Sequence, residues 1–143
     1  MTQIQRYFPH PPHEVWSALV DPASWWGKPD APPVDVTVGS AFTMTTVPVV
    51  GTRFNGVFEV EFLDAVPYEH LTLGLLAHAS TGQSARWTRH VAFREHEGGT
   101  LLTVTNRGVN LDDVDERILL RVVKEIQATE LYGIAKLLDQ PRP

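Results

Sequence analysis

The sequence contains no cysteine, and this absence excludes disulfides, thiol catalysis and cysteine-based zinc sites. No hydrophobic run approaches the roughly 18 residues of a membrane-spanning helix, and the N-terminal segment lacks the long apolar stretch of a signal peptide. Basic residues are also scarce, since 12 Lys and Arg stand against 17 Asp and Glu, and no basic block is longer than residues 86–89. We therefore expect a cytoplasmic protein that has no membrane span and does not bind nucleic acid.

What is present is the composition of one globular domain. The chain has 143 residues, of which 43% are hydrophobic and 20% charged, and its formal net charge is −5. A compact chain of about 150 residues buries roughly 70% of its unfolded surface, so a single core can hold it together. Internal repeats and low-complexity segments are absent. We expect a single domain over residues 1–143.

The first part of the chain predicts one strand and two short helices. Residues 3–8 alternate weakly between apolar and polar, which predicts a strand. The prolines at 11–12 suit the first turn of a helix whose apolar face carries Trp16 and Leu19. Residues 21–26 then predict a second short helix, which a glycine and a proline end.

The middle of the chain has a hydrophobic period of two, which predicts one strand after another. The apolar positions of these strands are Val34, Val36 and Val38; Phe42 and Met44; Phe54, Phe58, Val60 and Phe62; Leu71, Leu73 and Leu75; Trp87, Val91 and Phe93; and Leu102 and Val104. Residues 39–40 and 97–99 predict turns between neighbouring strands. One apolar and one polar face per strand is typical of an antiparallel sheet with one covered side.

The last segment has the period of a helix. Asn110 is expected to cap it, and acidic residues follow in the first turns, where the helix dipole favours them. Apolar residues from Leu111 to Leu137 form a stripe of roughly seven turns, and Pro141 ends the run. A helix with so much apolar surface needs a partner, and the sheet has a face to cover. We therefore predict an α+β fold in which about six to seven antiparallel strands wrap around a long C-terminal helix.

This order of elements resembles the helix-grip fold of the START-like (SRPBCC) superfamily, which includes polyketide cyclases, Bet v-type plant proteins and lipid-transfer domains. Residues 8–22, the Trp25-Trp26-Gly27 stretch and the hairpin start at residues 36–42 resemble the family related to the activator of heat-shock protein 90 ATPase. The resemblance extends to its later strands at residues 56–63, with Pro67 and Leu71, and at residues 98–105. The chain departs from that family at Ile126-Gln127, near the place where a Gly-Trp pair is common.

Two charged residues lie in phase with apolar faces. Arg89 falls two residues from both Trp87 and Val91, so its side chain should point inward, where an unpaired guanidinium is costly. On the helix, Glu130 lies about 60° or less from the centre of the apolar stripe. Three alternatives stay open for Arg89: an ion pair with Glu130 at the end of a pocket, binding of a ligand carboxylate or phenolate, and a break in register that leaves it at the solvated rim.

A third inward polar candidate is Asn106, which is in phase with Leu102 and Val104. The alternative is that Asn106 ends its strand and bonds to local backbone. The complete set of expected ligand-binding residues is Trp25, Trp26, Phe42, Met44, Phe58, Leu73, Trp87, Arg89, Asn106, Ile126 and Glu130. An indole at a pocket mouth stacks well on an aromatic ligand, which suits one of the two adjacent tryptophans.

Catalytic and metal-binding motifs are absent from the sequence. No nucleophile elbow or phosphate loop occurs, and Glu130 is the one weak candidate for a catalytic acid or base. The six histidines share no ligand-like spacing. We expect neither a metal nor a cofactor.

Three functions stay open. The first is binding of a small apolar or aromatic molecule in a cavity between sheet and helix. The second is an enzyme of the polyketide cyclase or dehydratase type that uses Glu130 and Arg89 in the same cavity. The third, implied by the family resemblance, is a co-chaperone-like role through a protein partner, although the eukaryotic relatives also use a partner-binding domain without a counterpart in these residues. Outward Val57, Leu63 and Val109 leave a homodimer open.

Overall fold

The computed structural model describes residues 2–21, 28–29 and 36–140. Its elements, in chain order, are β1 (Thr2–Phe8), α1 (Pro12–Leu19), β2 (Lys28–Pro29), β3 (Ala41–Thr45), β4 (Phe54–Val66), β5 (His70–Ala79), β6 (Ala85–His96), β7 (Gly99–Arg107) and α2 (Val114–Leu138). The second short helix, predicted over residues 21–26, lies outside the described residues from residue 22 onward, and Trp25 and Trp26 lie there with it.

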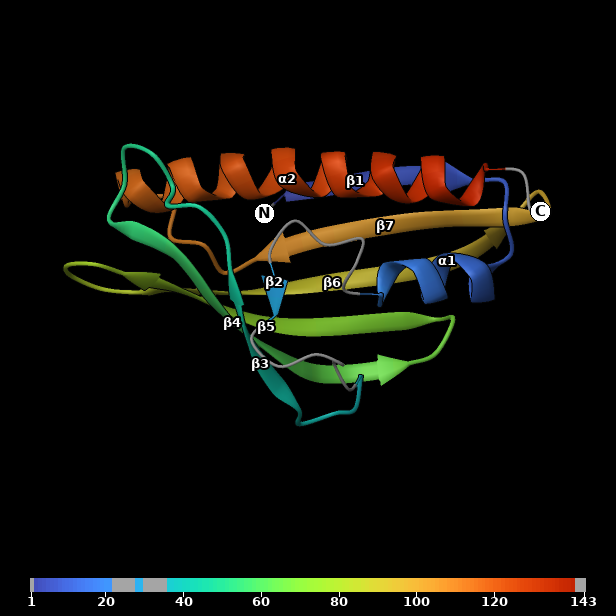
Figure 1. Cartoon of the computed structure of the whole chain (residues 1–143), viewed down its shortest axis with the longest axis horizontal. Helices are drawn as coiled ribbons and strands as arrows, with labels where there is room; N and C mark the ends of the chain where they lie inside the picture. The colour runs from blue at the N-terminus through green and yellow to red at the C-terminus, as the bar shows by residue number, and fades with distance from the viewer. Residues whose placement is uncertain (1, 22–27, 30–35, 141–143) are drawn as a thin grey trace.

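The strands form one antiparallel sheet in the order β1-β7-β6-β5-β4-β3-β2. Strands β3 to β7 pair with their neighbours in the chain, and β1 pairs with β7 through partners such as Ile4 and Val104. Figure 1 shows α2 running along the length of the sheet, with α1 near the C-terminal end of α2. The predicted α+β arrangement, in which an antiparallel sheet packs against a long last helix, is confirmed.

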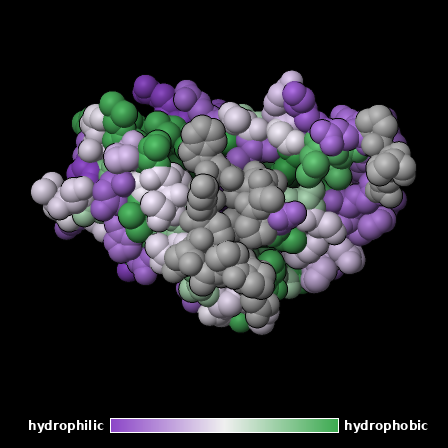
Figure 2. All heavy atoms as spheres, viewed as in Figure 1, coloured by the Kyte–Doolittle hydropathy of each residue, from purple (hydrophilic) through white to green (hydrophobic). Residues whose placement is uncertain are grey.

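Alternation within the strands decides which face of the sheet the helix covers. In β4, Phe58, Val60 and Phe62 are buried, while the intervening Glu59 and Glu61 are exposed. Burying a side chain as large as Phe or Val contributes about 1.5–3 kcal/mol, so the apolar face turns toward α2. The opposite face carries polar residues such as Glu59 and Glu61. On the side of the molecule that Figure 2 displays, hydrophobic residues lie in separate small groups among hydrophilic ones.

The buried side chains form two groups along the sheet. One group surrounds Phe8 and Trp16 and packs α1 and the second half of α2 onto the sheet. The other surrounds Phe54 and Trp87 and packs against Leu119 in the first half of α2. The candidate site lies between these two groups.

The predicted turn at residues 97–99 is present between β6 and β7. His96 pairs with Gly99, so the loop has two residues, Glu97 and Gly98. Their φ angles are 49° and 77°, the positive values of the tight turn that matches the twist of paired strands. Glycine makes this conformation accessible at the second position.

The strand predicted from Val34 to Val38 is wrong over its described part. Residues 36–38 form no strand, because Ser40 N donates to Thr37 O at 2.9 Å and the chain turns there. Val38 is consequently 57% exposed.

The predicted cap of the last helix is also wrong. The side chain of Asp113, not Asn110, accepts a hydrogen bond from a first-turn amide, that of Glu116, at 3.1 Å. Asn110 instead accepts from Asp112 N and forms a turn before the helix. Leu111, expected in the apolar stripe, therefore precedes α2 and is 49% exposed.

Candidate functional site

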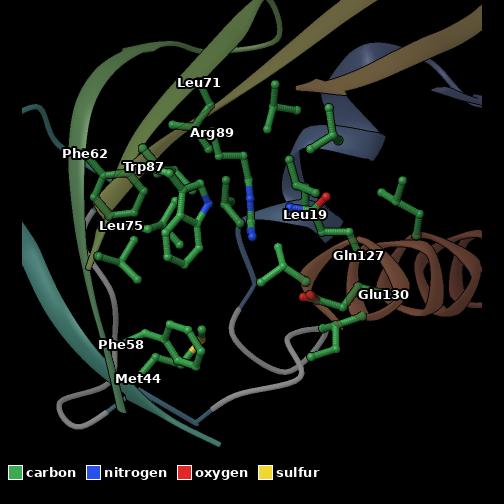
Figure 3. Close-up of a pocket in the computed structure, with 18 of the residues that line it drawn as sticks. Leu19, Met44, Phe58, Phe62, Leu71, Leu75, Trp87, Arg89, Gln127 and Glu130 are labelled. Carbon is green, nitrogen blue, oxygen red and sulfur yellow. The ribbon is translucent and has the colours of Figure 1, made fainter. Parts of the chain in front are cut away.

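A pocket of about 120 Å³ lies between the sheet and α2. Its walls come from the inward residues of β3 to β7, from the end of α1 and from one face of α2. Most of the lining is apolar, and the polar or charged side chains among the described lining residues are Thr46, Arg89, Gln127 and Glu130. Figure 3 shows Arg89 extending from its strand toward α2, with Trp87 on one side of it and Gln127 and Glu130 on the helix.

The structure brings most of the residues expected at the site together around this pocket. Those that line it are Phe42, Met44, Phe58, Leu73, Trp87, Arg89, Ile126 and Glu130. Asn106 is not among the described lining residues, because it lies behind Arg89 and is fully buried. Trp25 and Trp26 lie outside the described residues.

Arg89 points into the protein because β6 keeps its alternation without a break. Arg89 pairs with Leu73 of β5 and with Asn106 of β7, in unbroken register with Trp87 and Val91. Its side chain lies deep between sheet and helix, and the surface that it still exposes lines the pocket. The unbroken register therefore excludes the alternative in which a register break leaves Arg89 at the solvated rim.

Neutral amides hold the Arg89 guanidinium. The oxygen of the Gln127 carboxamide accepts from Arg89 Nε at 2.6 Å and from Nη2 at 2.7 Å. This orientation of the amide is assigned because the opposite one would place its NH₂ group against two N–H donors. Arg89 Nε also lies 3.3 Å from Asn106 Oδ1.

Asn106 connects this arrangement to the rest of the fold. Its Oδ1 accepts from Trp87 Nε1 at 3.3 Å, and its Nδ2 donates to Thr2 Oγ1 at 3.3 Å. Its own exposure is 1%. Instead of bonding to local backbone at a strand end, Asn106 joins β1, β6, β7 and α2, and it fixes the direction of both the indole and the guanidinium.

The direct ion pair between Arg89 and Glu130, one of the three alternatives left open for Arg89, does not form. The ion pairs within 4.0 Å among the described residues do not include it. Burial lowers the pKa of the Arg89 guanidinium, and the more distant negative charge of Glu130 partly opposes that effect. The pocket therefore holds a cation whose direct contacts with the described residues are uncharged.

Gln127 is the site residue that the sequence reasoning missed. It is 4% exposed and lies four residues after Val123 and four before Leu131, both of them buried. This spacing places it in the middle of the apolar stripe of α2. The same argument that selected Arg89, a polar residue in phase with apolar neighbours, would have found it.

The described part of the chain contains no arrangement of side chains that could bind a metal ion. No group of three or more His, Asp and Glu side chains in residues 2–21, 28–29 and 36–140 could hold an ion. His10 illustrates the reason, since its two ring nitrogens face different carboxylates, Glu14 at 3.3 Å and Asp139 at 2.7 Å. Neither α1 nor α2 has the length and hydrophobicity needed to span a bilayer.

Comparison with known proteins identifies related sequences and folds. The family model described as Activator of Hsp90 ATPase homolog 1-like protein matches residues 9–138. Among solved structures, protein MLL2253 from Mesorhizobium loti is similar at 21% identity with a TM-score of 0.79, covering 99% of this chain and 98% of that one. No curated protein matches the sequence significantly.

Two further similar structures are those of DynU16 and CalU16. DynU16, of the dynemicin biosynthetic locus, has 21% identity and a TM-score of 0.68, covering 99% of this chain and 48% of that one. CalU16 from Micromonospora echinospora has 21% identity and a TM-score of 0.65, covering 99% of this chain and 76% of that one. At these identities the likeness shows a shared fold.

Proposed function

The chain belongs to the Activator of Hsp90 ATPase homolog 1-like protein family, and from this premise we propose that it binds a small apolar or aromatic molecule in the pocket between the sheet and α2. The observation that carries the proposal is the pocket itself, about 120 Å³ of space enclosed mainly by apolar side chains. A ligand in this pocket would remove apolar side chains from water, which is favourable in proportion to the apolar area that it buries.

The shape of the lining supports an aromatic occupant. Phe42, Phe58 and Trp87 approach the pocket from β3, β4 and β6, and the rings of Phe58 and Trp87 meet edge to face at 6.3 Å. Aromatic walls favour stacked or edge-on contact with a further ring. Met44 adds a flexible, polarisable side chain that adapts to irregular shapes.

The first test is native mass spectrometry of the purified protein, followed by a thermal-shift screen of fatty acids, phenolics and polyketide-like aromatics. A ligand at one hundred times its Kd should stabilise the protein by about 2.7 kcal/mol. Ile126→Trp places an indole in the pocket from α2 and should abolish this stabilisation. Ile118→Trp is the matched control, because Ile118 is half-buried on the same helix away from the pocket lining.

Two results would contradict the binding proposal. One is that ligand stabilisation survives in Ile126→Trp, which would place the ligand elsewhere. The other is that the protein carries no bound mass and responds to none of the compounds, which would shift weight to a role through a surface partner.

A second candidate function is an enzyme of the polyketide cyclase or dehydratase type, favoured by the carboxylate of Glu130 in the pocket lining. A carboxyl group in an apolar pocket is suited to general acid–base work because desolvation moves its pKa toward neutrality. Under this alternative, polyketide-like aromatics that bind should also turn over, and Glu130→Gln should remove turnover while binding remains. Binding without turnover in the wild-type protein would exclude the alternative for those compounds.

A further inference from the structure

The guanidinium of Arg89 has unused hydrogen-bonding capacity directed at the pocket. Its Nε and Nη2 are bonded to Gln127 and Asn106. Its Nη1 bonds to none of the described residues and is not among their fully buried, unpartnered atoms. Since Arg89 lines the pocket, Nη1 is exposed to the space inside it.

The charge of Arg89 is poorly compensated in its own surroundings. Arginine keeps its proton at all ordinary pH values. A charge in an apolar interior is stabilised well only when an opposite charge contacts it. Here the contacts within hydrogen-bonding distance are the amide oxygens of Gln127 and Asn106, and Glu130 acts from farther away.

The other side chains that line the pocket limit the size and chemistry of the apolar part of the ligand. Around Arg89 the pocket is enclosed by aromatic and aliphatic side chains, among them Phe58, Leu73 and Trp87. Its volume of about 120 Å³ is close to that of the ~150 Å³ engineered cavity that holds benzene. The pocket volume therefore matches a ligand whose apolar part is a single aromatic ring.

We propose that the ligand is a small aromatic acid whose carboxylate or phenolate oxygen binds the Arg89 guanidinium while its ring lies against Phe58 and Trp87. This inference rests on the proposed binding function and names the chemical class of the ligand. The planar edge formed by Nη1 and Nη2 suits two parallel hydrogen bonds to a carboxylate. Gln127 and Asn106 act as positioning residues, because their bonds to Nε and Nη2 hold this edge toward the pocket.

Glu130 sets the selectivity of the same subsite. Its negative charge lies near enough to interact with Arg89 and also lines the pocket. It should therefore repel a bound anion and weaken, without preventing, its binding. Removing this charge should strengthen the binding of an acid and leave a neutral ligand of the same shape unaffected.

The test compares cinnamate with cinnamamide by isothermal titration calorimetry at neutral pH. The two probes share one ring and one side chain and differ in charge. Cinnamate should bind the wild-type protein about tenfold more tightly or better, the usual effect of a charge-assisted hydrogen bond. In Arg89→Gln the ratio of the two affinities should fall to about one, and in Arg89→Lys it should take an intermediate value.

The helix variants supply an independent readout. Glu130→Gln should increase the affinity for cinnamate severalfold without changing that for cinnamamide. Glu125→Gln is the matched control, since Glu125 is an exposed residue on the same helix and should change neither affinity. Thermal unfolding of every variant identifies any that fail to fold. If Arg89→Gln fails to fold, the affinities of the wild type, Arg89→Lys and Glu130→Gln for the two probes test the inference without it.

The outcomes separate this inference from the binding function on which it rests. Equal affinity of the wild-type protein for both probes, or a ratio that survives in Arg89→Gln, would overturn the inference and leave an apolar binding site standing. If the wild-type protein binds neither probe nor any other small aromatic compound, the binding function itself fails and the inference with it.

Discussion

At the residue scale, one buried asparagine organises the polar end of the pocket. The Asn106 side chain is bonded to Trp87, Thr2 and Gln127 and lies beside Arg89. A small residue at this position would leave the buried Trp87 indole N–H without its partner, and such a group costs about 1–3 kcal/mol. Its contribution is therefore both to stability and to the direction of the pocket side chains.

Asn106→Ala should lower the free energy of unfolding by about 2–4 kcal/mol, because it leaves the Trp87 indole N–H unpaired in the interior and removes the bonds of Asn106 to Thr2 and Gln127. Asn110→Ala is the matched control. Asn110 is exposed and its side chain accepts from Asp112 N, so its loss should cost less than about 1 kcal/mol. Urea unfolding measures both, and equal losses would refute the role given to Asn106.

At the element scale, charge contacts attach the start of α2 to Arg53, the residue just before β4. Arg53 Nη1 lies 3.0 Å from Asp113 Oδ1 and 3.3 Å from Asp115 Oδ2, and the backbone N–H of Arg53 donates to the same Asp115 oxygen at 3.0 Å. Asp113 is also the cap of the helix. The hydrogen bond from Arg53 is the main reason that the pKa of Asp113 is lowered.

This lowered pKa predicts a pH dependence. A carboxyl group whose folded pKa lies below its unfolded value stabilises the fold above the unfolded pKa, about 3.9 for Asp, and loses that contribution as the pH falls through the folded value. Asp113→Asn keeps a capping oxygen and removes the charge. The variant should therefore be less stable than the wild type at neutral pH, and the difference should shrink below about pH 4.

Urea unfolding at stepwise lower pH checks this dependence. Asp112→Asn serves as the control, because the Asp112 carboxylate makes no hydrogen bond or ion pair with the described residues. A stability difference for Asp113→Asn that stays constant under acid conditions would show that the charge of Asp113 does not contribute through Arg53.

At the scale of the whole molecule, His10 joins segments that are far apart in the chain. Its Nε2 lies 2.7 Å from Asp139 Oδ1, at the end of α2 and 129 residues away, and its Nδ1 lies 3.3 Å from Glu14 in α1. The backbone oxygen of His10 also accepts from the fully buried Thr100 hydroxyl at 2.8 Å. The start of α1, the end of α2 and β7 thus meet at one residue.

His10→Ala should reduce the free energy of unfolding by about 0.5–1.5 kcal/mol, the usual net value of a lost hydrogen bond. The control is His78→Ala, which removes an exposed pair with Glu59 on the outer face of the sheet. Such a pair contributes about 0–1 kcal/mol. Chemical unfolding distinguishes the two, and an equal or smaller effect at His10 would mean that the helix ends are held by packing alone.

Periodicity predicted the parts of the fold that depend on local rules. Alternation placed Phe58, Trp87 and Arg89 on the inward face, and the helical period produced the apolar stripe that covers it. It was less successful where competing turns decide the outcome, at Val36–Val38 and at the helix cap, because nearby side chains and backbone groups offer rival hydrogen bonds there.

By itself, the sequence determined the antiparallel sheet, the long last helix and the inward direction of Arg89, since side-chain direction repeats with the backbone period. The tertiary structure alone decided that Gln127 and Asn106, 21 residues apart, bond to each other and hold Arg89, and that Glu130 stays beyond direct contact. The reason is physical. Which polar groups meet in an interior depends on how separate elements pack. The local periodicity of a sequence does not specify the distance between residues on different elements.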